Sequence, residues 1–215
     1  MNYKAVLFDL DGTLLDTLED LADSMNAALA RVGAPQHPTP AYRHFVGDGV
    51  IELSRRVLPA DRRDEATIKA AAAAMGEEYH KRWAAKTRPY PGIPELLDAL
   101  TARHVAMAVL SNKNNNFTQL CVKKLLGRWR FDVVQGLDET IHKKPDPSGA
   151  LSVARQLAVA PADFLYLGDT NTDMKTAVAA GMFPVGALWG FRTAEELTAS
   201  GAKVLIAQPM DLLKL

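Results

Sequence analysis

The sequence has a single cysteine and no net charge. Cys121 cannot form a disulfide within the chain, and its place among apolar residues at helical spacing predicts a buried thiol. The 25 basic side chains balance the 25 acidic ones, so the chain has no overall field that would attract nucleic acid or an anionic membrane surface. A binding site for an anion would therefore be local.

Long hydrophobic runs are also missing from the chain. No apolar stretch approaches the roughly 20 residues that a membrane span needs, and the first residues resemble a strand rather than a signal peptide. We therefore expect a cytoplasmic protein with neither a membrane nor a nucleic-acid partner. The five histidines lack the close spacing of a zinc-binding helix, which argues against a histidine metal site.

Short apolar runs recur along the chain, and they are typical of buried strands. They are AVLF (5–8), HVAMAVL (104–110), FDVV (131–134), FLYL (164–167), FPVGAL (183–188) and KVLI (203–206). Amphipathic helical patterns lie between most of them, at 94–103, 117–126, 147–157 and 172–180. This alternation predicts an α/β fold with a parallel sheet covered by helices on both faces.

One interval, from about Thr17 to Arg88, breaks the alternation and predicts an all-helical insert. Its first helix begins after Asp16 or Thr17 as N-cap and ends near Gly33, and a later helix runs through 64–83, where alanine is abundant. The segment RPYPGIP (88–94) interrupts helical structure after the insert. We therefore expect one unit at 17–88 and another at 1–16 and 89–215, with a hinge at their junctions.

Polar residues follow several of the predicted strands. They occur in DLDGT (9–13), SNK (111–113), HKKPDP (142–147) and GDTNTD (168–173). Ligands of open parallel sheets bind outside the carboxyl ends of the strands, so these segments are expected to share one crevice. Each segment alone could be an ordinary turn or helix cap. The four together, in this order and each after an apolar strand, favour a functional site.

The carboxylates in these segments predict a site for a hard metal ion. Asp9, Asp11, Asp169 and Asp173 would repel one another in a single crevice unless a cation lay among them. Mg²⁺ fits best, because it binds a few carboxylates, keeps several waters and accepts a phosphate oxygen as a ligand. Lys144 and the backbone near Ser111 and Asn112 would add positive character, a combination suited to a phosphate dianion. Gly12 is typical of a turn that lets the backbone approach a phosphate closely.

FDLDGT, SNK, KKP and GDTNTD resemble the four ordered motifs of the phosphatase branch of the haloacid dehalogenase superfamily, and the resemblance covers essentially the whole chain. It implies a Rossmann-like core at 1–16 and 89–215, with an all-helical cap domain at 17–88 inserted after the first strand. The cap position agrees with the helical interval found independently from the sequence pattern.

The resemblance also implies a role for each site residue. Asp9 would be the nucleophile that forms an aspartyl-phosphate, and Asp11 would be the general acid and base. The Asp9 carboxylate, the Asp11 backbone carbonyl and Asp169 would hold Mg²⁺, with Asp173 orienting the set. The residues expected to bind the transferring phosphoryl group are Ser111, the Asn112 amide and Lys144. The Thr13 hydroxyl would orient a carboxylate.

Within the superfamily, two features of the sequence argue against other enzyme types. Asp11 argues against true dehalogenases, which lack an aspartate two residues after the nucleophile. The only lysines of the insert, Lys69, Lys81 and Lys86, match no phosphonate-hydrolase motif that supplies a Schiff-base lysine.

The substrate prediction depends on the insert and the C-terminal region. YRHFVGDGV (42–50) and the segment 168–197 resemble phosphoglycolate phosphatases, although VGDG alone could be a glycine turn between helices. Asn114 stands where that group often has proline, and GALWGF replaces a tyrosine-containing version. We therefore expect phosphoglycolate or a similar small phosphorylated metabolite as substrate, with a β-phosphoglucomutase-like or other sugar-phosphate enzyme as the alternative. A catalytically silent phosphate-binding protein is the remote alternative, and the sequence leaves monomer or homodimer open.

Overall fold

The computed structural model of the chain describes residues 3–215, which fall into two compact units. One unit contains the residues up to Leu15 together with Pro89–Leu215, and the other contains Asp16–Arg88. The chain changes units at β2 (Leu15–Asp16) and β3 (Arg88–Pro89), two short strands that pair with each other. Residue 16 was expected in the larger unit, and it falls in the smaller one because β2 itself spans the junction.

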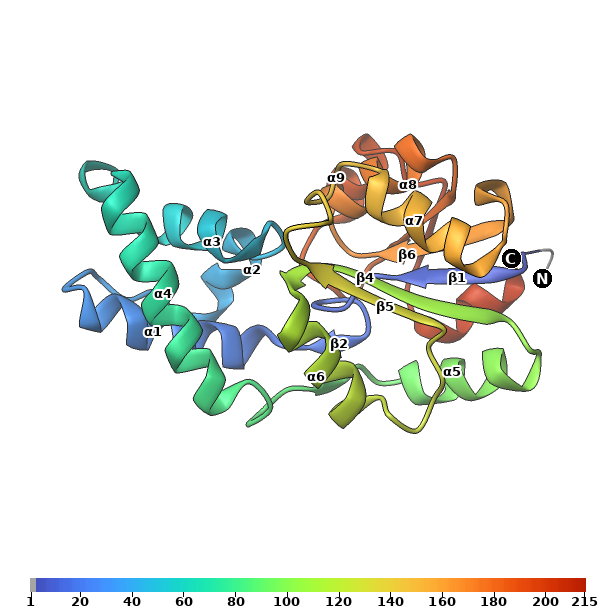
Figure 1. Cartoon of the computed structure of the whole chain (residues 1–215), viewed down its shortest axis with the longest axis horizontal. Coiled ribbons are helices and arrows are strands. Elements are labelled where there is room, and N and C mark those ends of the chain that lie inside the picture. The colour runs from blue at the N-terminus through green and yellow to red at the C-terminus, as the bar shows by residue number, and fades with distance from the viewer. Residues whose placement is uncertain (1–2) are drawn as a thin grey trace. The chain divides into compact units, whose positions relative to one another are not determined.

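A six-stranded parallel sheet forms the larger unit, in the order β5-β4-β1-β6-β7-β8 (Figure 1). The strands are β1 (Ala5–Phe8), β4 (Ala106–Asn114), β5 (Val133–Leu137), β6 (Phe164–Gly168), β7 (Phe183–Ala187) and β8 (Val204–Ile206). Every apolar run predicted to be a strand overlaps one of them. The predicted α/β fold with a parallel sheet is confirmed.

Strand β1 lies inside this sheet, and its sequence explains why. All four of its residues are buried, as expected for a parallel strand with neighbours on both sides and helices on both faces. Leu7 pairs in register with Ala108 of β4 and with Tyr166 of β6. Asp9, the residue that follows β1, therefore lies near the middle of the carboxyl edge of the sheet.

Helices cover the two faces of the sheet in the larger unit (Figure 1). Helices α7 (Ser148–Leu157) and α8 (Asn171–Ala180) lie on one face, and α5 (Ile93–Ala102) and α6 (Asn115–Leu125) lie on the other. Alternate residues of β1 separate to these faces: Leu7 belongs to a buried cluster with residues of α7 and α8, whereas the Phe8 ring meets Phe131 edge to face. The four predicted helices are observed, with ends within two residues of those expected.

The remaining helical elements of this unit are short. They are α9 (Ala194–Ala199) and the 3₁₀ helices η3 (Pro161–Asp163) and η4 (Pro209–Lys214). Helix α9 was not predicted, because six residues are too few to display helical periodicity. Cys121 is fully buried in α6, as predicted.

Between β2 and β3, all the secondary-structure elements of the smaller unit are helices. It contains α1 (Leu18–Arg31), η1 (Thr39–Ala41), α2 (Tyr42–Phe45), α3 (Gly49–Val57), η2 (Ala60–Arg62) and α4 (Glu65–Arg82). Helix α4 packs against α1 and α3. Among the described residues, no helix has both the length and the apolar character that crossing a membrane requires.

The two ends of the smaller unit are joined by one buried carboxylate. Asp20, in the first turn of α1, accepts hydrogen bonds from the Thr87 backbone N–H (2.8 Å) and hydroxyl (2.7 Å), and from the Lys86 N–H. Thr17 stands at the N-cap of α1 as predicted, but its side chain does not cap the helix. The Thr17 hydroxyl is buried and has no hydrogen-bond partner among the described residues.

Candidate active site

The predicted site residues of the larger unit gather at the carboxyl edge of its sheet. Asp9 follows β1, Asp169 follows β6, and Ser111 and Asn112 lie in the last part of β4. Since β1 lies between β4 and β6, these three strand ends are neighbours. Asp11 is in the turn after β1, where Gly12 has a φ of 91°, a backbone conformation that glycine adopts without strain.

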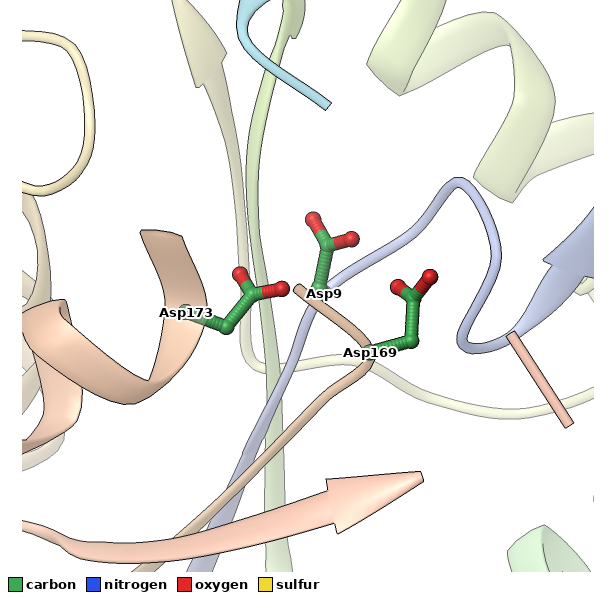
Figure 2. A group of neighbouring side chains, drawn as sticks. All are labelled: Asp9, Asp169 and Asp173. Carbon is green, nitrogen blue, oxygen red and sulfur yellow. The ribbon is translucent and has the colours of Figure 1, made fainter. Parts of the chain in front are cut away.

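Three aspartates form a compact group of buried carboxylates. Oxygen atoms of Asp9, Asp169 and Asp173 lie within 4.8 Å of one another. Figure 2 shows that their side chains come from separate segments of the chain and bring their carboxylates together. Asp173 lies in the first turn of α8, where Thr170 and Asp173 form a capping box. The end of α8 thus supplies one of the three carboxylates.

Lys144 lies among these carboxylates and is buried. Its Nζ atom donates to Asp9 Oδ1 and to Asp173 Oδ1, both at 2.7 Å, and to the Leu110 carbonyl oxygen at 3.0 Å. An ammonium group has three N–H donors, so every donor of Lys144 has an acceptor. This lysine links the residue after β1 to α8 and to β4.

The loop that carries Lys144 is fixed by the side chain of Asn112. Asn112 Oδ1 accepts from the Lys144 backbone N–H at 2.8 Å, and Asn112 Nδ2 donates to the Lys144 carbonyl oxygen at 3.2 Å. The side chain of Asn112 therefore holds the backbone of residue 144 from both sides. Its own backbone amide was the group predicted to bind phosphate.

Burial dominates the electrostatics of the group. Burial and then the charge of Asp173 raise the pKa of Asp9 to about 7, against the opposing effect of Lys144. Burial, followed by the charges of Asp9 and Asp173, raises the pKa of Asp169 well above its usual value. Burial alone would lower the pKa of Lys144, but Asp173 and Asp9 raise it well above its usual value. The carboxylates thus carry excess negative charge that one lysine does not neutralise.

Asp169 is held by two segments far from it in sequence. Its Oδ1 accepts from the Thr13 hydroxyl at 2.8 Å, and its Oδ2 accepts from the Phe191 backbone N–H at 2.7 Å. A Cβ atom at Gly190 would lie 2.2 Å from Asp169 Cβ, so only glycine fits there. The indole Nε1 of Trp189 donates to the Thr13 carbonyl oxygen at 3.0 Å, which connects the two segments.

Comparison with known proteins identifies the family. A family model described as "Haloacid dehalogenase-like hydrolase" matches residues 6–187, which include every site residue predicted from the sequence. The chain belongs to the haloacid dehalogenase-like hydrolase family. The phosphoglycolate phosphatase of Nitrosospira multiformis is 31% identical over 215 residues, covering 99% of this chain and 95% of the relative. The predicted family and enzyme class are thereby confirmed.

Solved structures share the fold over almost the whole chain. A predicted phosphoglycolate phosphatase from Haemophilus somnus has a TM-score of 0.90 at 28% identity, covering 100% of this chain and 98% of the other. CbbY from Rhodobacter sphaeroides, solved in complex with phosphate, has a TM-score of 0.81 at 25% identity, covering 98% and 96%.

The donor set of this family member fits a hard divalent cation. Both oxygens of Asp173 are engaged, Oδ1 by Lys144 and Oδ2 by the Thr170 N–H (3.0 Å) and hydroxyl (2.7 Å). Each Asp169 oxygen accepts one hydrogen bond, and an oxygen has two lone pairs. Each Asp169 oxygen therefore still has a lone pair that can bind a metal ion, whereas hydrogen bonds already occupy most lone pairs of the Asp173 carboxylate. Carboxylate oxygens of this kind suit Mg²⁺ better than a softer metal.

The structure also brings residues to this site that received no role from the sequence. Lys113 contacts Asp11, and Tyr166 donates to Asp173 Oδ1 at 3.5 Å. Lys113 could have been found, since it belongs to the SNK motif and lies two positions from Ser111, which places both on one face of an extended strand. Trp189 and Phe191 gave no such signal, because their partners in the sequence are distant.

Proposed function

We propose that the chain is a Mg²⁺-dependent phosphatase that hydrolyses phosphate monoesters through an aspartyl-phosphate on Asp9. The observation that carries the proposal is the environment of Asp9, whose Oδ1 is fixed by the buried ammonium of Lys144 and whose neighbours include Asp169. A carboxylate held in this way can present its other oxygen to a phosphorus atom. Family membership and the names of the phosphoglycolate phosphatase relatives support this chemistry.

The first step forms a bond between an Asp9 oxygen and phosphorus, and the bond from phosphorus to the ester oxygen breaks. Asp11 gives its proton to the departing oxygen, which leaves as an alcohol. Asp11 then accepts a proton from water as the water oxygen attacks phosphorus. The Asp9–phosphorus bond breaks, inorganic phosphate leaves, and both aspartates return to their starting states.

The phosphoryl oxygens need positive charge and hydrogen-bond donors during this transfer. Ser111, the Asn112 backbone amide and Lys144 are proposed to bind them, as they come from β4 and the neighbouring loop at the same edge of the sheet. Lys144 would exchange one of its three present contacts for a phosphoryl oxygen. A bound Mg²⁺, held by Asp9, Asp169 and the Asp11 backbone carbonyl, supplies charge that lowers the repulsion between Asp9 and a phosphate dianion. Asp173 and Thr13 orient Lys144 and Asp169 through the contacts described above.

We propose 2-phosphoglycolate or a similar small phosphorylated metabolite as the substrate. The support is the identity of the curated relatives and the resemblance of residues 42–50 to the substrate-facing loop of that group. Residues 17–88 are proposed to act as the cap domain over the core. A cytoplasmic location and a monomeric or dimeric state stay predictions from the sequence.

A steady-state panel tests this function. The panel contains 2-phosphoglycolate, glucose 6-phosphate, β-glucose 1-phosphate, ethyl phosphate and 4-nitrophenyl phosphate, each with Mg²⁺ and with metal-stripped protein in EDTA. We expect release of inorganic phosphate only with metal, and the highest kcat/KM for 2-phosphoglycolate. If kcat/KM is highest for a sugar phosphate, the substrate is a sugar phosphate, as in the alternative stated above. Turnover that persists with chelator, or none with any ester, would overturn the metal-dependent phosphatase assignment.

A further inference from the structure

Lys113 makes a close ion pair with the proposed general acid. Its Nζ atom lies 2.7 Å from Asp11 Oδ1 and 2.8 Å from Asp11 Oδ2, so one ammonium group spans both oxygens. The Lys113 side chain is only 7% exposed and that of Asp11 is 18% exposed. A lysine is almost never buried to this degree unless it is paired with an opposite charge, and here Asp11 supplies that charge.

The backbone at Lys113 is fixed by several contacts of its own. Strand β4 continues past its apolar run to Asn114, and its register with β5 shifts between Leu110 and Asn114. The Lys113 N–H donates to the Ser111 hydroxyl, and the Thr118 hydroxyl donates to the Lys113 carbonyl oxygen. A Cβ atom at Gly136 would lie 2.7 Å from that same carbonyl oxygen. Irregular strand ends of this kind re-aim side chains near functional sites.

Contact with Asp11 places Lys113 beside the leaving group. A general acid must come within about 2.6 to 3.2 Å of the oxygen that it protonates. The Lys113 ammonium, in contact with both Asp11 oxygens, is therefore within a few ångströms of the ester oxygen of a bound substrate. In 2-phosphoglycolate the carboxylate carbon is two bonds from that oxygen, so its carboxylate falls within reach of the same ammonium group.

The positions of two lysines support a second anion at this place. The donors of Lys144 are directed at Asp9, Asp173 and Leu110. The Lys113 ammonium is directed instead at Asp11, the residue proposed to serve the leaving group. A substrate carboxylate beside the leaving group can therefore bind the same ammonium, because the flexible stem of lysine needs little movement to reach it.

We propose that Lys113 is a specificity residue that binds the carboxylate of a phosphorylated α-hydroxy acid. Lys113 thereby selects esters whose carboxylate is carried on the carbon next to the ester oxygen. This inference rests on the proposed phosphatase function and names the part of the site that distinguishes 2-phosphoglycolate from an uncharged alkyl phosphate.

The test compares two substrates in each variant, because their ratio cancels any effect of Lys113 on Asp11 that both substrates share. We expect Lys113→Met to lower the ratio of kcat/KM for 2-phosphoglycolate to that for ethyl phosphate by about 10- to 100-fold, the loss of one charge-assisted hydrogen bond. Lys113→Arg should recover most of the ratio. Lys123→Met, on the exposed surface of α6, is the matched control and should leave the ratio unchanged. Equal losses on both substrates would overturn the proposal while the phosphatase function stands.

A binding measurement keeps the inference testable even without turnover. Calorimetry in Mg²⁺ would compare the affinities of Asp9→Asn and Asp9→Asn/Lys113→Met for 2-phosphoglycolate and for ethyl phosphate. We expect Lys113→Met to weaken the binding of 2-phosphoglycolate about 10- to 100-fold more than the binding of ethyl phosphate. Should Lys113→Met not fold, as judged by circular dichroism, Lys113→Gln takes its place. Equal weakening of the two ligands overturns the inference, and absence of turnover with any ester overturns the phosphatase proposal separately.

Discussion

The ammonium group of Lys144 lies 2.7 Å from Asp173 Oδ1, and this contact ties the active-site lysine to the first turn of α8. The same nitrogen lies 2.7 Å from Asp9 Oδ1. Because Asp173 is also part of the capping box of α8, the helix end and Asp9, the proposed nucleophile, are connected through Lys144. The geometry of Asp9 therefore depends on residues more than 130 positions away in the chain.

Lys144→Met is expected to destabilise the metal-free protein by about 3 to 5 kcal/mol, since it leaves buried carboxylates without their cation. Mg²⁺ should recover part of the loss, because it would restore positive charge among the same oxygens. Urea unfolding with and without Mg²⁺ measures both effects. Lys143→Met, at an exposed neighbouring position, is the control and should change the free energy of unfolding by less than about 0.5 kcal/mol. A Lys144→Met protein as stable as the control would contradict the role given to this ion pair.

The stability of the metal-free protein should fall as the pH rises from about 4 to about 7. The pKa of Asp9 is raised from 3.8 to about 7 and that of Asp169 is raised well above its usual value, so the folded state holds protons that the unfolded state has already released. Stability from a raised carboxyl pKa is complete below the unfolded pKa and is lost as pH rises toward the folded one. Lys144 does not contribute in this window, because it is charged in both states.

Mg²⁺ should therefore raise the melting temperature more at pH 7.5 than at pH 5. At the lower pH protons already neutralise part of the group and compete with the cation. Thermal melting of chelator-treated protein, with and without Mg²⁺ at both pH values, gives the comparison. An equal shift at the two pH values would mean that these carboxylates do not bind the ion.

Much of this site could be predicted from local sequence, and the rest could not, for a physical reason. Asp9 and Asp169 each follow an apolar strand, and parallel strands bring their carboxyl ends to one edge, so strand identity alone indicated that they would meet. The contacts around Asp169 have no local pattern. Trp189 and Thr13 are separated by 176 positions, and their hydrogen bond uses a backbone carbonyl that no residue type encodes.

The fold, like the site, could be predicted only in part from local sequence. Periodicity predicted the strands and the four longer helices of the larger unit, because burial on one or both faces imposes it. Helix α9 was not predicted because it is too short to show helical periodicity. The extension of β4 to Asn114 was not predicted because polar residues occupy it and its pairing with β5 is irregular. Lys113 lies in this extension, and although its spacing to Ser111 could have pointed to the site, its contact with Asp11, 102 positions away in the chain, depends on where the strand end aims the side chain.

Trp189→Phe should weaken Mg²⁺ binding by about tenfold. The substitution removes the indole hydrogen bond to Thr13, whose hydroxyl orients Asp169, and loss of such outer contacts typically costs ten- to a hundredfold in metal affinity. Trp129→Phe is the matched control, because it also removes an indole hydrogen bond, to Asp98 on the surface, far from the metal ligands in sequence. Calorimetric titration with Mg²⁺ measures both. Equal affinities in the two variants would leave Trp189 without a positioning role.

Replacing Asp9 or Asp11 with asparagine should impair catalysis in different ways. Asp9→Asn removes the attacking oxygen, so no phosphoenzyme should form and turnover should fall to a trace. Asp11→Asn keeps the nucleophile but removes the proton donor and base, which should slow attack on an alkyl phosphate by roughly 10² to 10⁴. The nitrophenolate of 4-nitrophenyl phosphate needs little protonation, so the first step on this ester should be partly spared.

Hydrolysis of the intermediate still requires a base in Asp11→Asn, and a phosphoryl label should therefore accumulate on the chain when 4-nitrophenyl phosphate is the substrate. Lys113 would keep its charge in this variant but lose its carboxylate partner, so Lys113→Met/Asp11→Asn separates the proton-transfer defect from the altered charge. Mass spectrometry of acid-quenched protein should place the label on Asp9 in both variants. A label on Ser111 in these variants, a label on Asp11 in the unsubstituted protein, or substantial turnover by Asp9→Asn would overturn the roles assigned to this pair.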